Sequence, residues 1–120
     1  MGLPTSKKSK RHDQAKLPVK TGIADYAELH CITNFSFLRG ASFPEELVEH
    51  ADRLGYEAIA ITDECSVSGV VRAHTAAKKS GIKLIIGSEF LLSDGCQIVF
   101  LATNKVGYGQ LCHLITCSRR

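Results

Sequence analysis

A short apolar run that turns abruptly polar decides the fold of this chain: Ala58-Ile59-Ala60-Ile61-Thr62, followed by Asp63-Glu64-Cys65-Ser66. An uninterrupted run of alanine and β-branched residues is typical of a strand that is buried on both faces, as in a parallel sheet covered by helices. The polar tetrad begins where such a strand has to end, so it predicts a loop at the carboxyl edge of the sheet. This run is therefore the expected centre of an α/β fold.

Helical periodicity flanks this run on both sides. Before it, Ser42 is the predicted N-cap of a helix, Glu45 completes a capping box, and Gly55 ends the helix. The apolar face of this helix recurs at spacings of three and four, at Leu47, Val48, Ala51 and Leu54. After the run, a second helix is expected over Val67–Ser80, closed by Gly81.

The remaining segments complete the order β-α-β-α-β-β-α. Strands are expected over Tyr26–Ile32, Lys83–Gly87 and Gln97–Ala102, and a third helix runs from about Tyr108 to the C-terminus. Alternation of apolar strands with amphipathic helices predicts that the first strands are parallel. Right-handed crossovers would then place the first two helices on one side of the sheet, as in an open-ended piece of an α/β barrel.

Composition indicates one soluble domain. Of the 120 residues, 44% are hydrophobic and 22% are charged, which are ordinary values for a globular protein. No apolar run approaches the roughly 18 to 20 residues of a membrane span, and no secretory signal is recognisable, so we expect the cytoplasm and no membrane partner. The five cysteines include no CxxC pair, which favours reduced thiols over a disulfide framework or a zinc knuckle.

The net charge of +3 is unevenly distributed. Residues 1–22 contain six Lys or Arg against Asp13 alone, a net charge of +5, so the rest of the chain carries −2. We expect a disordered basic tail over residues 1–22 and a folded domain over residues 23–120. A nucleic-acid-binding tail is the alternative, and its phosphate contacts would come from Lys7, Lys8, Lys10 and Arg11. The lack of aromatic residues that stack on bases favours a solvated leader.

Polar side chains cluster where three of the predicted strands end. Glu28–His30 with Thr33-Asn34, then Asp63-Glu64, then Ser88-Glu89 occupy these positions. In an α/β barrel such residues meet at the carboxyl ends of the strands. Histidine and carboxylates suit zinc or manganese, which can activate water for phosphoester hydrolysis. Asp and Glu at strand ends also serve as helix caps, so the spacing alone leaves both interpretations open.

Four blocks of sequence, in the same order, resemble the PHP (polymerase and histidinol phosphatase) domain of bacterial error-prone DNA polymerases related to the alpha subunit of DNA polymerase III. These blocks are Tyr26–Ser42, Ala58–Ser66, Gly69–His74 and Gly81–Phe90, and Asn104–Arg120 is similar to a later helix of the family. The resemblance implies the N-terminal part of a PHP-type distorted (β/α) barrel, with the barrel truncated in this chain.

The resemblance also implies a depleted metal site. The family's His-x-His motif reads His30-Cys31-Ile32, its Asp-Gly reads Arg39-Gly40, its Thr-Asp-His reads Thr62-Asp63-Glu64, and its Gly-x-Glu is retained at Gly87-Ser88-Glu89. The ligands that remain for zinc or manganese would be His30, Glu64 and Glu89. Asp63 would orient a ligand or cap the second helix. A cation at Arg39 would repel a divalent metal if it pointed into the cleft, which favours a structural PHP domain with no catalytic residue.

By resemblance, the parent protein would be a translesion DNA polymerase active in damage-induced mutagenesis and DNA repair. Its magnesium-dependent nucleotidyl transfer would depend on aspartates of a palm domain outside this chain, and DNA would be bound through the same missing domains. Translesion accessory proteins and a sliding clamp would be its partners. Two alternatives remain: a stand-alone PHP-type metal-dependent phosphoesterase, and a non-catalytic binding module that docks on polymerase partners.

Overall fold

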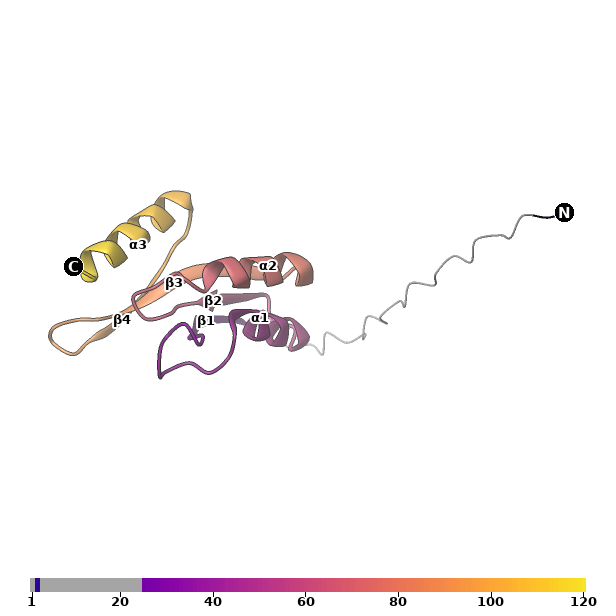
Figure 1. Cartoon of the computed structure of the whole chain (residues 1–120), viewed down its shortest axis with the longest axis horizontal. Coiled ribbons are helices and arrows are strands. Elements are labelled where there is room, and N and C mark those ends of the chain that lie inside the picture. The colour runs from indigo at the N-terminus through magenta and orange to yellow at the C-terminus, as the bar shows by residue number, and fades with distance from the viewer. Residues whose placement is uncertain (1, 3–24) are drawn as a thin grey trace.

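The apolar run at residue 58 forms an inner strand of a four-stranded sheet in the computed structural model, which describes residues 2 and 25–120 (Figure 1). The strands lie in the order β1-β2-β3-β4. Their bounds are Ala27–Cys31, Ala58–Ile61, Lys83–Leu91 and Gln97–Leu101. The β1/β2 and β2/β3 pairs are parallel and the β3/β4 pair is antiparallel. All four residues of β2 are buried, as expected for a strand at the centre of the fold.

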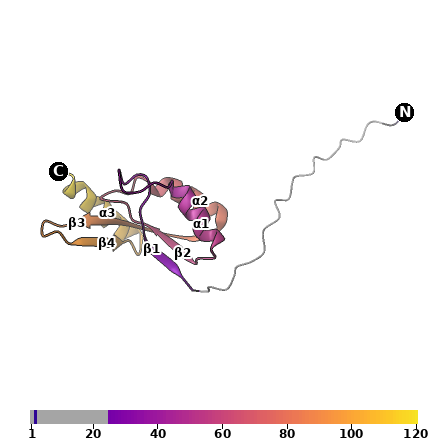
Figure 2. The ribbon, with the colours of Figure 1, turned by 90° about the horizontal axis from the view of Figure 1, so that it is seen from below.

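Helices α1 (Pro44–Arg53) and α2 (Val70–Ser80) lie on the same side of the sheet (Figure 2). They share one apolar core with β2, formed by Val48, Ala51, Ile59, Ile61, Ala73, Ala76 and Ala77 together with Ile82. The alanines of α2 bring its backbone close to the sheet, which suits the close packing of protein interiors. The element order, the parallel strands and the shared helix face confirm the predicted partial α/β barrel.

The predicted start of the first helix was wrong by one residue. The N-cap is Phe43 rather than Ser42, and the side chain of Glu46 accepts a hydrogen bond from the Phe43 N–H at 2.9 Å. Glu45 instead pairs with Arg72 of α2. The guanidinium of Arg72 also lies 4.9 Å from the centre of the Phe43 ring. The Glu45 carboxylate, which the local spacing assigned to the helix cap, therefore forms a tertiary ion pair instead.

Three other boundaries differ by three or four residues from the sequence-based expectation, and the ends of β1, β2 and β4 differ by one. Helix α2 begins at Val70 rather than Val67, because residues 67–70 form a turn closed by the Val70 N–H and the Val67 carbonyl. Helix α3 (Lys105–Ser118) begins before Tyr108, where the side chain of Asn104 accepts the Gly107 N–H at 2.8 Å. Strand β3 continues to Leu91, because β4 pairs with it beyond the end of β2. Among the described residues, no helix is long and apolar enough to cross a membrane.

A buried carboxylate holds the β1–α1 loop (residues 32–43) against the end of β2. Asp63 is 1% exposed, and its Oδ1 accepts hydrogen bonds from the Thr33 N–H at 2.7 Å and the Ser36 hydroxyl at 2.8 Å. Its Oδ2 accepts the Thr33 hydroxyl at 2.7 Å. The interpretation of Asp63 as a cap of the second helix was wrong, because the N-cap of α2 is Gly69 and takes no side-chain hydrogen bond. Asp63 organises a loop instead.

Substitution of Gly87 tests how closely β3 approaches β4. A Cβ atom at Gly87 would lie 2.6 Å from the Phe100 carbonyl oxygen and 2.7 Å from a Leu101 methyl group. We expect Gly87→Ala to lower the free energy of unfolding by about 1 to 3 kcal/mol through overpacking. Gly109→Ala is the matched control, because a Cβ there meets nothing within 4 Å and helix propensity should raise the free energy by about 0.5 to 1 kcal/mol. Urea unfolding followed by circular dichroism measures both, and equal effects would refute the close approach.

Substitution of Asp63 tests whether this side chain anchors the β1–α1 loop. We expect Asp63→Ala to lower the free energy of unfolding by about 3 to 5 kcal/mol, because three donors would be left buried without an acceptor. Asp94→Ala is the control, since the exposed Asp94 accepts one turn hydrogen bond, from the Cys96 N–H. Its loss should cost about 1 kcal/mol or less. If urea unfolding showed the same loss for both variants, Asp63 would not be the anchor.

Candidate functional site

Four charged or titratable side chains meet near the carboxyl ends of the parallel strands. They are His30 on β1, Arg39 in the β1–α1 loop, Glu64 in the loop after β2, and Glu89 on β3. Two of the predicted metal ligands, Glu64 and Glu89, contact Arg39, and the third, His30, contacts Glu89. Glu89 does not follow the third strand, as the sequence suggested, but lies within it. A parallel bridge between Glu64 and Glu89 carries the sheet pairing up to the site.

Glu89 is the most buried member of the group. It is 2% exposed, and its backbone is fixed by hydrogen bonds from its N–H to the Asp63 carbonyl and from the Cys65 N–H to its own carbonyl. One carboxylate oxygen, Oε1, accepts a hydrogen bond from Nη1 of Arg39, and the other, Oε2, lies 2.6 Å from Nε2 of His30. The bond from Arg39 lowers the pKa of Glu89 despite burial, and His30 acts in the same direction. Glu89 is therefore held as a carboxylate.

Arg39 joins the buried carboxylate to an exposed one. Its Nη1 lies 3.2 Å from Oε2 of Glu64 as well as contacting Glu89. Hydrogen bonds from these two glutamates, Glu89 first, raise the pKa of Arg39 above its already high ordinary value. The side chains of Arg39 and Glu64 are 36% and 45% exposed, so the ion-pair cluster runs from the interior to the surface.

The backbone of the β1–α1 loop directs Arg39 toward this cluster. Leu38 adopts the left-handed conformation with φ 62°, which an L-residue with a side chain rarely adopts. The Arg39 N–H then donates to the Ser36 carbonyl at 3.0 Å. The next residue has to be glycine, because a Cβ at Gly40 would lie 1.9 Å from the Thr33 carbonyl oxygen. A constrained turn therefore presents the guanidinium.

His30 and Cys31 differ in their surroundings although they are neighbours. The His30 side chain is 48% exposed, and its backbone N–H donates to Glu28 at 3.1 Å. Cys31 packs against the core, and burial raises the pKa of its thiol to about 11. The five cysteines, all within the described residues, are free thiols. Cys31 thus behaves as the small apolar residue that the sequence indicated.

As arranged, these side chains do not fit a divalent cation. Among the described residues, no three His, Cys, Asp or Glu side chains form a group that could hold a metal ion. The Arg39 guanidinium contacts both Glu64 and Glu89, and the second oxygen of Glu89 faces His30. Metal binding by His30, Glu64 and Glu89 stays a prediction. The tail residues Lys7, Lys8, Lys10 and Arg11 lie outside the described residues.

Sequence reasoning identified Arg39 only as a group that would repel a metal, and it missed Ser36. The Ser36 hydroxyl donates to Asp63 and accepts the Glu64 N–H at 2.9 Å, so it links the loop to the residue after β2. Ser36 stands between Phe35 and Phe37 without any spacing that signals this role. Its function depends on contacts made across about 27 residues of chain, which local patterns do not encode.

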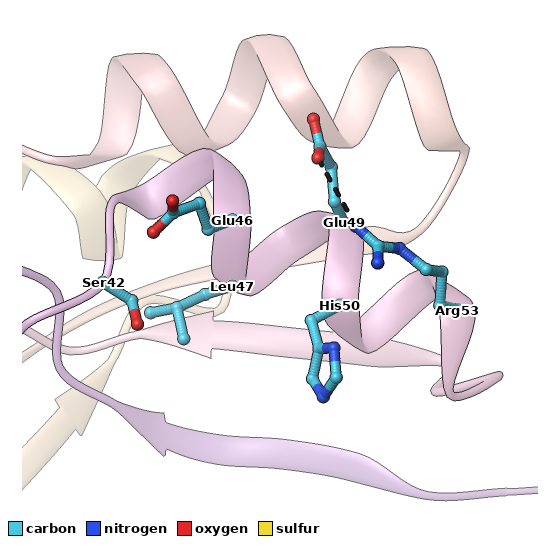
Figure 3. Close-up of a pocket in the computed structure, with 6 residues that line it drawn as sticks. All are labelled: Ser42, Glu46, Leu47, Glu49, His50 and Arg53. Carbon is cyan, nitrogen blue, oxygen red and sulfur yellow. Dashed lines mark ion pairs between the residues drawn. The ribbon is translucent and has the colours of Figure 1, made fainter.

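A separate shallow pocket of about 330 Å³ lies along α1 and contains no residue of the cluster. It is lined by Ser42, Glu46, Leu47, Glu49, His50 and Arg53 (Figure 3). Glu49 and Arg53 form an exposed ion pair at 3.9 Å, and the side chains spread along the helix rather than converging on a point. This surface provides no second chemical site.

Solved structures share the fold. An amidohydrolase from Chromobacterium violaceum, solved with bound sulfate and no metal, matches 71% of this chain with a TM-score of 0.59 and 27% identity. A candidate metal-dependent phosphoesterase from Bifidobacterium adolescentis matches 72% of the chain with a TM-score of 0.55 and 28% identity. This chain covers 31% and 32% of the two proteins, respectively, as expected for part of a barrel.

Curated relatives are closer in sequence. The chain is 62% identical over 98 residues to an error-prone DNA polymerase of Dechloromonas aromatica, and 64% identical over 97 residues to one of Methylococcus capsulatus. These matches cover 82% and 81% of this chain but only 10% and 9% of the relatives, so the chain spans about a tenth of their length. The PHP domain family matches residues 28–120. This chain belongs to the PHP domain family and corresponds to the N-terminal PHP portion of error-prone DNA polymerases.

Proposed function

We propose that this chain is the N-terminal PHP portion of an error-prone translesion DNA polymerase, in which it acts as a structural domain without hydrolytic activity of its own. The observation that carries the proposal is the identity of 53% to 64% with error-prone DNA polymerases over most of the chain. Relatives this similar conserve the fold and the packing of a domain, so the same position in a larger enzyme is the natural context.

Within this proposal, nucleotidyl transfer belongs to parts of the parent enzyme outside this chain. Those parts would bind DNA and the magnesium ions of the polymerase reaction during damage-induced mutagenesis and DNA repair. Translesion accessory proteins and a sliding clamp would be partners of the whole enzyme, and its compartment would be the cytoplasm. This chain would contribute a rigid sheet with two packed helices.

The ion-pair cluster supports a role without hydrolysis. Metal-assisted hydrolysis requires a cation with an open position where water can bind and lose a proton. Here the position between Glu64 and Glu89 is taken by Arg39, whose guanidinium only donates hydrogen bonds and stays charged. The side chains of the site thus stabilise one another rather than activating water.

A stand-alone metal-dependent phosphoesterase is the second candidate. Its support is the fold shared with the candidate phosphoesterase of Bifidobacterium adolescentis and the retained side chains His30, Glu64 and Glu89. The third candidate, a non-catalytic binding module, is supported by two apolar side chains at the tip of the β1–α1 loop. Phe37 is 84% exposed and Leu38 is 90% exposed. Docking through them on the rest of a polymerase would be one form of the structural role.

A chimeric polymerase tests the structural role. The matched segment of the Dechloromonas aromatica enzyme is replaced by the corresponding residues of this chain, with which it is 62% identical. We expect primer extension on a damaged template to remain within about threefold of the parent, because well-packed domains tolerate substitutions that preserve the core. The same chimera with Asp63→Ala is expected to lose activity on heating at a lower temperature. A soluble, folded chimera that does not extend primers would contradict the proposal.

Phosphoester hydrolysis separates the first two candidates. The purified 120-residue chain is incubated with p-nitrophenyl phosphate in EDTA, in Mn²⁺ or in Zn²⁺. We expect no release of p-nitrophenol above the metal-only blank, because Arg39 occupies the position where a catalytic cation would have to bind. The Glu89→Gln variant controls for contaminating phosphatases. Turnover that needs Mn²⁺ and disappears in this variant would establish the phosphoesterase instead.

A further inference from the structure

We propose that the Arg39 guanidinium is the resident cation of this site, and that it cross-links the strand ends as a bound divalent metal would in a metal-binding site of this geometry. The inference concerns the stability of the chain itself, so it goes beyond the proposed role in a polymerase and does not depend on it. It follows from the mismatch between the side chains present and a divalent ion.

The contacts of Arg39 are those of a bridging cation. A single nitrogen, Nη1, contacts carboxylate oxygens of Glu64 and Glu89, which follow β2 and lie within β3, respectively. The remaining oxygen of Glu89 is 2.6 Å from Nε2 of His30 on β1. The cluster therefore ties together three parallel strands and the β1–α1 loop.

Burial makes this cation necessary. A carboxylate that is 2% exposed is strongly destabilising unless a positive charge or several hydrogen bonds compensate for its lost hydration. Apart from Arg39, the only side chain among the described residues that makes a hydrogen bond or ion pair with the Glu89 carboxylate is His30, and His30 is half exposed. Removal of Arg39 would leave Glu89 without its cationic partner.

The loop delivers Arg39 in a prearranged position. Asp63 and Ser36 hold the loop, Leu38 turns the chain in the left-handed conformation, and Gly40 permits the close contact with Thr33. An incidental surface ion pair has no such support. The pair Arg53–Glu49 is an example, with a distance of 3.9 Å and side chains that are 72% and 59% exposed.

Substitution of Arg39 is expected to make the thermal stability of the chain depend on a divalent metal. Arg39→Gln removes the positive charge that both Glu64 and Glu89 contact, and a Mn²⁺ ion between these two carboxylates would replace it. Carboxylate oxygens suit Mn²⁺, which also has less affinity than zinc for the five free thiols. Metal should therefore stabilise the variant and leave the wild-type chain unchanged.

Thermal unfolding of the 120-residue chain by circular dichroism tests this, in EDTA and in excess MnCl₂. The wild-type Tm is expected to be the same in both. Arg39→Gln is expected to melt about 10 °C or more below wild type in EDTA, because breaking a buried ion pair leaves an uncompensated charge, and to recover part of this loss in Mn²⁺. The matched control Arg53→Gln should melt within about 2 °C of wild type under both conditions.

Two results would overturn the inference. One is a wild-type Tm that Mn²⁺ raises as much as it raises the Tm of Arg39→Gln, and the other is an Arg39→Gln variant that melts with wild type in EDTA. If Arg39→Gln does not fold in EDTA, the double variant Arg39→Gln/Glu89→Gln decides. We expect the double variant to fold, because a neutral amide needs no cation. A double variant as unfolded as the single one would refute a charge-compensating role for Arg39.

Discussion

The burial of Glu89 at the carboxyl end of the sheet is the constraint on which the site depends. Its backbone is fixed by the pairing between β3 and its neighbours, and the residue is 2% exposed. A carboxylate in that position requires a cation or several hydrogen-bond donors nearby. Arg39 meets this requirement from a loop that is 50 residues earlier in the chain. The conformation of the β1–α1 loop thus depends on the negative charge of Glu89 on β3.

A second buried carboxylate, Asp63, is stabilised differently. Among the described residues it contacts no cation, and three neutral donors from Thr33 and Ser36 satisfy its oxygens. These bonds shape the β1–α1 loop, and the shaped loop then places the guanidinium against Glu89. The two acids therefore have complementary roles. Asp63 organises the loop through hydrogen bonds, and Glu89 forms an ion pair with Arg39 of that loop. The two residues are also joined through their backbones, because the Glu89 N–H donates to the Asp63 carbonyl.

The fold could be predicted largely from the sequence, because the run at residues 58–62, the apolar helix faces and Gly55 and Gly81 are local signals of strands and helix ends. The errors arose where a tertiary partner competed with a local one. Glu45 has the spacing of a capping residue but pairs with Arg72 across two helices. The candidate site followed from resemblance and topology. The role of Arg39 could not be predicted in this way. It depends on the positive φ of Leu38 and on hydrogen bonds between the β1–α1 loop and Asp63, which are distant in sequence.

A guanidinium and a metal ion differ in what they allow a site to do. Both neutralise carboxylates and hold strand ends together, but a metal has coordination positions that water can occupy, whereas a guanidinium offers only N–H donors in a fixed plane. With Arg39 between Glu64 and Glu89, the cluster has the cross-linking effect of a cation, and the guanidinium itself offers no coordination position for water. Arg39 is also covalently attached, so the cross-link does not depend on the metal supply. Such a site suits the structural role that we propose for this chain.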